Sequence, residues 1–244
     1  MQNLFSIRWI SFLALIHCLF VTCSDSENND ALIVTYTVDP AKQNIAFYWK
    51  DENCRILKSL QQLKAFVEQK NLKLNFAMNG GMFNADFSPK GLYIENNILL
   101  TSLDTGKGEG NFYLQPNGVF YITNENKAVV SKTENYIIKT DVKFATQSGP
   151  MLVIEGQINK EFRPGSSNRF IRNGVGILPN NKIIFALSKQ AINLYDFAEF
   201  FKAKGCVSAL YLDGFVSRAY IPYKNWNQLD GDFGVMIGVT ETIK

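Results

Sequence analysis

Two aspartates are the candidates for acid–base chemistry. Asp213 follows the apolar run 207–212 and precedes Gly214, a position typical of catalytic carboxylates, although an Asx turn or a helix N-cap also uses it. Asp86 lies in another polar loop and is the second choice. Either carboxylate could take a proton from water or stabilise a developing positive charge.

Basic and amide side chains lie upstream of Asp213. The stretch 166–174 contains Arg169 and Arg172, and Asn173 follows directly. A planar guanidinium donates two parallel hydrogen bonds, which suits a phosphate group. The two arginines therefore predict an anion clamp. The alternative is that both are solvated or paired with surface acids.

Two glycine-containing loops provide further ligand-binding candidates. Gly80 and Gly81, after Asn79, could let the backbone approach a ligand and turn N–H groups toward an anion, although a plain turn explains the same residues. Ser148, which follows Gln147 and precedes Gly149-Pro150, could be a nucleophile, but no histidine base is available, and a simple loop is the alternative. Ser217, beyond Asp213, is another candidate.

Histidine chemistry is excluded if the N-terminal segment is removed. The single histidine, His17, lies in that apolar segment. A chain without histidine cannot use Ser-His-Asp or Cys-His catalysis or a histidine-ligated metal. We therefore expect no cofactor. A divalent metal on Asp213 and phosphate oxygens would be compatible with the chain, but no spacing indicates one.

The apolar pattern that must position these residues predicts an α+β fold, a single domain with a mixed, many-stranded sheet and two or three packed helices. We expect helices within 56–70 and 192–205. The alternating segments 31–39 and 46–50 predict a hairpin-like pair. Further strands are expected within 72–79, 91–130, 151–159, 174–188 and 207–214. The polar clusters then fall at strand ends, where a rigid frame holds loops in place.

The N-terminus is typical of an export signal. Arg8 closes a short basic region and an apolar run extends to residue 22. Cys23 follows, so we predict a lipoprotein-type signal over 1–22 with Cys23 acylated as the first mature residue, ordinary secretion being the alternative. Residues 23–30 would be a tether and 31–244 the folded domain. We expect the periplasmic or surface face of a bacterial membrane, with a lipid anchor.

Length and charge exclude several classes of protein. A chain of 244 residues that is 46% hydrophobic suits one packed domain. Its net charge of +3 is too small and too little clustered for a nucleic-acid partner. Cys54 and Cys206 would form either one disulfide or two buried free thiols. The sequence does not indicate an oligomeric state.

Taken together, the polar clusters resemble the phosphodiester glycosidase family, which includes a lysosomal uncovering enzyme and many bacterial exported proteins. The similar stretches keep the family's order: Asn79-Gly80-Gly81-Met82-Phe83, Ser148-Gly149-Pro150, Arg172-Asn173-Gly174-Val175-Gly176 and Leu212-Asp213-Gly214 with Ser217. The chain is more similar still to a bacterial exported subgroup with the motifs NGGM, SPxGLY, GNF, PNGVFY, ATQSGPMLV and RNGVG, which start here at 79, 88, 110, 116, 145 and 172.

The resemblance implies hydrolysis of a sugar-1-phosphodiester in envelope or exopolysaccharide glycans, with a carbohydrate phosphate as the partner. Arg172, with Arg169, would bind the phosphate. Asp213 or Asp86 would activate water or stabilise an oxocarbenium-like sugar. The implied substrate-binding residues are Asn79, Gly80, Gly81, Gln147, Ser148, Asn173 and Ser217.

Some residues depart from the family pattern. Phe215 and Val216 replace two glycines, Asn173 replaces a threonine, and Phe170-Ile171 replace an Asn-Pro pair. We expect Phe215 and Val216 to crowd the loop after Asp213. An inactive, anionic-glycan-binding lipoprotein is therefore the alternative to a hydrolase, and a structural envelope lipoprotein is the third hypothesis. Convergence of Asn79, Ser148, Arg172 and Asp213 would argue against the third.

Overall fold

A computed structural model describes residues 31–137 and 140–243 of the chain. The predicted export signal, Cys23 and the tether over 23–30 lie outside the described residues. Within the described residues, no helix is long and apolar enough to cross a membrane.

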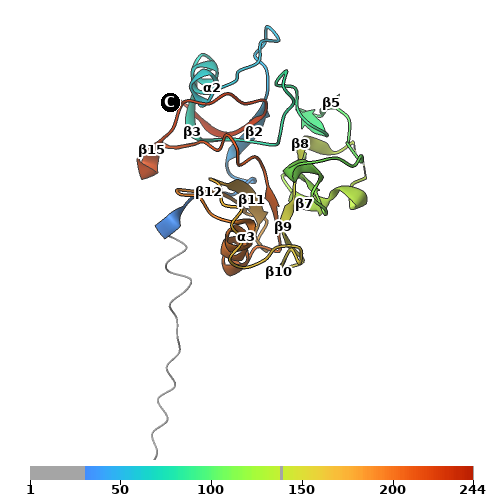
Figure 1. Ribbon diagram of the computed structural model, residues 1–244. Helices are drawn as coiled ribbons and strands as arrows, with labels where there is room; N and C mark the ends of the chain where they lie inside the picture. The colour runs from blue at the N-terminus through green and yellow to red at the C-terminus, as the bar shows by residue number, and fades with distance from the viewer. Residues whose placement is uncertain (1–30, 138–139, 244) are drawn as a thin grey trace, which may run out of the picture.

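The strands are divided among three antiparallel sheets (Figure 1). The first sheet has the order β1-β12-β11-β13-β9-β10, with β1 at Ile33–Val38, β9 at Met151–Ile154, β10 at Gln157–Ile158, β11 at Asn173–Ile177, β12 at Ile183–Ser188 and β13 at Ser208–Tyr211. The second has the order β15-β14-β3-β16-β2, with β2 at Asn44–Tyr48, β3 at Leu72–Asn79, β14 at Ala219–Ile221, β15 at Trp226–Asn227 and β16 at Met236–Thr242.

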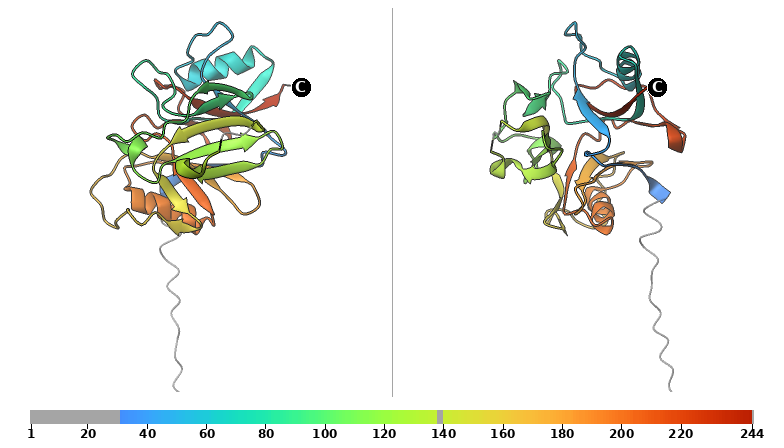
Figure 2. Two further views of the ribbon diagram at one scale, coloured as in Figure 1. Left: turned by 90° about the vertical axis from the view of Figure 1, so that its right-hand side faces the viewer. Right: turned by 180° about the vertical axis from the view of Figure 1, so that it is seen from behind.

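The third sheet faces the viewer, in green and yellow, in the left view of Figure 2. Its order is β5-β4-β8-β6-β7, with β4 at Tyr93–Glu95, β5 at Ile98–Thr101, β6 at Gly118–Thr123, β7 at Ala128–Lys132 and β8 at Val142–Ser148. Single 3-10 turns lie at Asn111–Tyr113, Thr133–Asn135 and Pro222–Lys224.

The main apolar core lies between the three sheets. The ring of Phe185 in β12 lies 5.0 Å from that of Phe76 in β3 and 6.0 Å from that of Phe120 in β6. Each sheet therefore contributes one of these buried rings. Removal of such large apolar surfaces from water is the dominant favourable term in folding.

Two helices cover the outer faces at opposite ends of the molecule (Figure 1). Helix α2, Leu60–Glu68, begins where Ser59 accepts a hydrogen bond from the Gln62 amide, and it packs on the second sheet. Helix α3, Leu194–Ala203, is capped by Asn193 and packs its phenylalanines on the first sheet. Both caps satisfy N–H groups that a helix start leaves unpaired.

The α+β single-domain prediction is confirmed, as are the two helices and the 174–188 hairpin. The predicted pairing of 31–39 with 46–50 is wrong, because β1 pairs with β12 and β2 pairs with β16. The turn after Asp39 carries the chain from the first sheet to the second. Alternation identifies a strand with one buried face, but it does not identify the partner strand.

The two cysteines are both free thiols, so the disulfide alternative is wrong. Cys206 is buried beside α3, and burial raises the pKa of its thiol to about 12. Cys54 is exposed, so only one of the thiols is buried.

Substitution Phe185→Ala should lower the free energy of unfolding by about 3–5 kcal/mol, because it leaves a cavity where the three sheets meet. Denaturant unfolding would measure the change. Phe215→Ala is the matched control, because the Phe215 side chain is 89% exposed and its loss should change stability by less than about 0.5 kcal/mol. Equal losses in the two variants would contradict a shared three-sheet core.

Candidate functional site

Several of the predicted site residues converge where strand ends of the three sheets meet. In the first sheet Gly174 is paired with Tyr211, so Asn173 at the start of β11 lies beside the end of β13. In the second sheet Met78 is paired with Ala219, which places Asn79 at the end of β3 near the start of β14. The loop 212–218 joins these two sheets, and Ser148 ends β8 of the third.

Asn79, Asn173 and Asp213 form one hydrogen-bond network. Asn173 Nδ2 donates to the carbonyl of Asn79 at 2.9 Å and to its Oδ1 at 3.0 Å. Asn173 Oδ1 accepts from the Asp213 amide at 2.8 Å, and Asn79 Nδ2 donates to the Asp213 carbonyl at 3.0 Å. Both asparagines are buried, so each polar group needs such a partner.

Two serines extend this Asn79–Asn173–Asp213 network. The hydroxyl of Ser217 donates to the Asp213 carbonyl at 3.0 Å, and that of Ser148 donates to the Leu212 carbonyl. Both serines are buried. The network therefore links all three sheets and fixes the backbone on either side of Leu212.

The Asp213 carboxylate remains largely uncommitted while its backbone is held. Its Oδ1 accepts one long hydrogen bond, 3.3 Å, from the Phe215 amide, which is the Asx-turn geometry. The residue is half-buried, and burial raises the pKa of the carboxyl to about 6. Asp213 is therefore mainly ionised at neutral pH and close to the range that suits a general base.

Arg172 is a fully buried cation. Its Nε donates to the Ile192 carbonyl at 2.7 Å, and Nη2 donates to the carbonyl and Oδ1 of Asn168 at 2.9 and 2.8 Å. Nη1 has no hydrogen-bond partner, and no carboxylate of the described residues forms an ion pair with this guanidinium. Burial lowers the pKa of Arg172. The arrangement leaves a positive charge without a neutralising anion.

Tyr211 connects Arg172 with the loop after Asp213. The guanidinium lies 5.4 Å from the centre of the Tyr211 ring, and the Tyr211 hydroxyl occupies the space where a side chain on Gly214 would begin. Burial raises the pKa of Tyr211, Arg172 opposes this shift and Asp213 adds to it. The sequence analysis did not single out Tyr211, although its place two residues before Asp213 in the predicted strand 207–214 would put both residues on one face.

Gln147 has no hydrogen-bonding capacity left for a substrate in this arrangement. Its Oε1 accepts from the amides of Leu92 and Asp104 at 3.0 and 2.9 Å. Its Nε2 donates to the Asp104 carbonyl at 2.7 Å and to Thr133 Oγ1 at 3.3 Å. An amide has two donor hydrogens and two acceptor lone pairs, and all four are used.

Gly81 lets the second and third sheets approach each other, and Gly80 allows a close approach to the segment before β16. A Cβ on Gly81 would lie 2.2 Å from Thr146 Oγ1, and one on Gly80 would lie 2.9 Å from the Val235 side chain. The Gly80 amide donates to the Val235 carbonyl at 2.8 Å, so it does not face a ligand.

Asp86 and Arg169 lie apart from the network. Asp86 is exposed, and hydrogen bonds from the side chain and amide of Ser88 lower the pKa of its carboxyl. Arg169 is exposed and donates to the Ala191 carbonyl at 2.9 Å. None of the contacts within the described residues joins either side chain to the Asn79–Asn173–Asp213 network.

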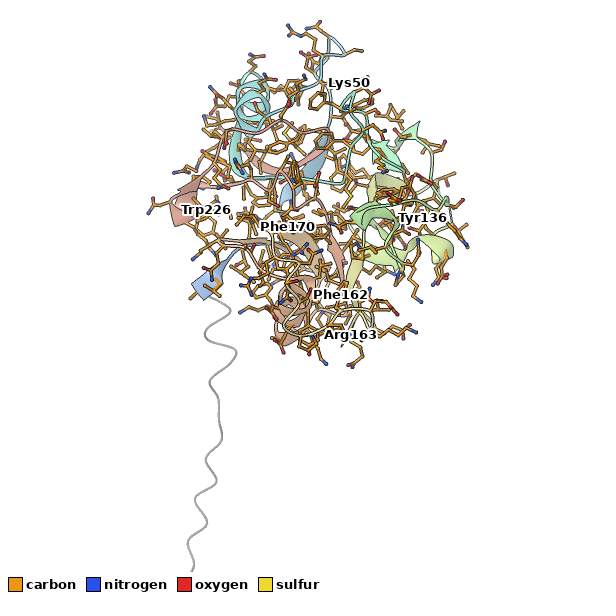
Figure 3. The ribbon with its side chains drawn as sticks, in the orientation of Figure 1. Lys50, Tyr136, Phe162, Arg163, Phe170 and Trp226 are labelled. Atoms are coloured by element: carbon orange, nitrogen blue, oxygen red, sulfur yellow. The ribbon has the colours of Figure 1, made fainter. Side chains whose placement is uncertain are left out.

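The expected crowding of the loop after Asp213 is wrong for Phe215, which is 89% exposed. Val216 packs beside the apolar residues under α2. Phe170, labelled in Figure 3, is half-exposed. The centre of its ring lies 5.6 Å from the Arg172 guanidinium. No group of three or more Cys, His, Asp or Glu residues able to hold a metal occurs within the described residues.

Comparison with known proteins gives the family. The phosphodiester glycosidase family model matches residues 73–240, so the chain belongs to that family, as the motifs predicted, and its function is of the glycosidase type. It is also 37% identical over 212 residues to the uncharacterised protein YigE of Escherichia coli K12, covering 86% of this chain and 83% of that protein.

Solved structures share the fold. The catalytic domain of zebrafish N-acetylglucosamine-1-phosphodiester alpha-N-acetylglucosaminidase, auto-inhibited by its pro-peptide, gives a TM-score of 0.60 at 14% identity, covering 86% of this chain and 84% of that one. A protein of Burkholderia pseudomallei K96243, named as a candidate exported protein, gives a TM-score of 0.56 at 10% identity. The match covers 85% of this chain and 73% of that one.

Substitution Asn173→Ala should lower the free energy of unfolding by about 3 kcal/mol, because it leaves the buried Asp213 amide without an acceptor and removes both hydrogen bonds from Asn173 to Asn79. Denaturant unfolding measures the change. Asn135→Ala is the control, since Asn135 is exposed and makes no side-chain hydrogen bond within the described residues. Similar stability of the two variants would contradict the proposed importance of the network.

Substitution Asp213→Asn should stabilise the protein above pH 6. The folded-state pKa of Asp213 is about 6 and its usual value is 3.8, so the wild-type stability that this carboxyl contributes is full below pH 4 and lost as pH rises through 6. The variant should gain about 3 kcal/mol over wild type between these limits. Denaturant unfolding at pH 4 and pH 8 measures the gain.

Asp86→Asn is the control, because the pKa shift of Asp86 on folding has the opposite sign to that of Asp213. The pKa of Asp86 is lowered in the folded state, so its removal should bring no gain as pH rises. A stability difference for Asp213→Asn that is independent of pH would overturn the raised pKa.

Proposed function

We propose that the chain hydrolyses a sugar-1-phosphodiester in an envelope or exopolysaccharide glycan, releasing the sugar and leaving a phosphomonoester. The observation that carries the proposal is a buried cation without an ion pair, Arg172, and a carboxylate with a pKa of about 6, Asp213, which both interact with Tyr211. The name of the zebrafish enzyme, which acts on an N-acetylglucosamine-1-phosphodiester, supports the choice of substrate class.

Arg172 binds the phosphate in this proposal. A phosphodiester carries a negative charge, and a phosphate oxygen would provide the partner that Nη1 lacks. Because the guanidinium is buried, the half-exposed Phe170 ring that packs against it must move to admit the phosphate. The positive charge then stabilises the phosphomonoester as it leaves.

Asp213 acts on the attacking water. Its carboxylate takes a proton from water as the water oxygen bonds to the anomeric carbon, and the bond from that carbon to the phosphate oxygen breaks with its electron pair going to the phosphate. A phosphomonoester is already a good leaving group, so no strong general acid is required. No histidine is needed at any step.

Other predicted residues position this pair. Asn79, Asn173, Ser148 and Ser217 hold the backbone around Asp213 by their hydrogen bonds. Gln147 fastens the segment that contains Leu92 and Asp104. We assign these side chains a positioning role, and we keep substrate contact for the Asp213 carboxylate and Arg172.

We also propose that the protein is exported and anchored by lipid at Cys23. An apolar segment followed by a cysteine supports this proposal. The Burkholderia protein with the same fold, named as a candidate exported protein, is in keeping with export. Mass spectrometry of the mature N-terminus, with acylated Cys23 as the expected result, tests both statements.

Substitutions Asp213→Asn and Arg172→Ala should each lower the rate of sugar release at least about tenfold, because each removes a group that acts in the transition state. The substrate is the methyl diester of N-acetylglucosamine 1-phosphate. The wild-type rate should also fall as pH drops through about 6, where Asp213 becomes protonated.

Asp86→Asn and Arg169→Ala are the matched controls, and both should retain wild-type rates if Asp213 and Arg172 are the acting pair. Circular dichroism checks that Arg172→Ala, which removes a buried side chain, is folded. Unchanged activity in both site variants would contradict their assigned roles. Substrate binding without turnover by wild type would favour the alternative, an inactive anionic-glycan-binding protein.

A further inference from the structure

Tyr211, the last residue of β13, is a buried tyrosine that carries out no step of the proposed hydrolysis. It is 2% exposed, so its polar hydroxyl lies inside the protein together with the ring. A buried hydroxyl costs free energy unless it has hydrogen-bond partners. The groups that surround the hydroxyl therefore indicate what the residue does.

The main chain on both sides fixes the place of Tyr211. Its amide donates to the Pro150 carbonyl at 3.0 Å, and in the first sheet the residue is paired with Gly174 of β11. The next amide, that of Leu212, donates to the Asn173 carbonyl at 3.1 Å. The Tyr211 side chain thus extends from a backbone that neighbouring segments hold in place.

The Tyr211 hydroxyl holds the peptide that follows Asp213. The Gly214 amide donates a hydrogen bond to the hydroxyl oxygen, which opposes the rise in the Tyr211 pKa that burial causes. The two groups are in close contact, because a Cβ on Gly214 would lie 1.8 Å from that oxygen. Gly214 is buried, so its amide needs an acceptor within the protein.

The three amides around Asp213 each have a different acceptor. The Asp213 amide donates to Asn173 Oδ1 at 2.8 Å, the Gly214 amide donates to the Tyr211 hydroxyl, and the Phe215 amide donates to the Asp213 carboxylate at 3.3 Å. Asn173 therefore fixes the peptide before Asp213, and Tyr211 fixes the peptide after it. Fixing both peptides limits the directions in which the carboxylate can point.

The ring of Tyr211 serves the other member of the proposed pair. Its centre lies 5.4 Å from the Arg172 guanidinium, a separation at which an aromatic ring attracts a cation. Tyr211 also opposes the lowering of the Arg172 pKa by burial. The carbonyl of Ile171, just before Arg172, lies against Gly214, since a Cβ on Gly214 would be 2.9 Å from it. The segments that contain Arg172 and Asp213 therefore meet at Tyr211.

We propose that Tyr211 is a positioning residue that sets the orientation of Arg172 and Asp213 relative to each other. The inference rests on the proposed hydrolysis and adds a residue that acts through this pair rather than on the substrate. The hydroxyl aligns the carboxylate and the ring aligns the guanidinium. Such alignment affects the rate strongly, because a small misplacement of a reacting group slows attack.

The first test separates the hydroxyl from the ring. Tyr211→Phe removes only the hydroxyl, so kcat for the methyl diester of N-acetylglucosamine 1-phosphate should fall at least about tenfold with KM within about twofold of wild type. Tyr211→Leu also removes the ring beside Arg172, and it should raise KM about fivefold or more in addition. Thermal unfolding checks that both variants are folded.

Tyr36→Phe is the matched control. Tyr36 is a buried tyrosine of the same sheet, 6% exposed, and its hydroxyl accepts a hydrogen bond from Gln43 at 3.2 Å. Loss of a buried hydroxyl in itself should leave kcat and KM within about twofold of wild type. A loss of kcat in Tyr36→Phe equal to that in Tyr211→Phe would overturn the positioning role.

Amide hydrogen exchange followed by NMR needs no turnover and separates the two proposals. In Tyr211→Phe the Gly214 amide should exchange at least about tenfold faster than in wild type, whereas the Leu212 amide, bonded to the backbone of Asn173, should change less than about twofold. Faster Gly214 exchange, together with a wild type that hydrolyses no diester, supports the positioning of Asp213 and defeats only the proposed hydrolysis. Unchanged Gly214 exchange, or a wild-type kcat in Tyr211→Phe, overturns the positioning role and leaves the hydrolysis standing.

Discussion

The site depends on one constraint: the polar groups buried where the three sheets meet must satisfy each other. Asn79 and Asn173 belong to different sheets, and each bonds both to the other and to the backbone of Asp213. An unpaired buried donor or acceptor would cost about as much as a lost hydrogen bond. The same contacts that close the fold therefore set the position of Asp213, and the carboxylate needs no ligand of its own to hold it there.

Arg172 is the counterpart of this network, because its positive charge is held without being neutralised. Carbonyl groups and two aromatic rings surround the guanidinium, and these stabilise a cation less than a carboxylate would. A buried ion pair would be easier to maintain, but a paired guanidinium would have little attraction left for a phosphate. The arrangement suits anion binding at some expense in stability, which is common at functional sites.

A feature could be predicted from the sequence where the residues that determine it lie close together in the chain. Helix α3 and the β11–β12 hairpin have nearby caps and turns, and both were predicted. The positions of Asn79, Ser148 and Asp213 at strand ends were predicted, but which strand ends meet was not. The pairing of β1, the four hydrogen bonds of Gln147 and the contact of Tyr211 with Arg172 depend on partners distant in sequence. Neither the composition nor the hydrophobic periodicity of a segment identifies such distant partners.

Burial shifts both members of the proposed pair toward neutrality, raising the pKa of Asp213 and lowering that of Arg172. A bound phosphodiester would add a negative charge between them. That charge favours the protonated guanidinium, but by the same Coulomb law it disfavours ionisation of Asp213. The Asp213 carboxylate can then remain ionised, and act as a base, only if the positive charge of Arg172 offsets most of the effect of the phosphate charge. This condition favours a phosphate that lies closer to Arg172 than to Asp213, with the anomeric carbon on the Asp213 side.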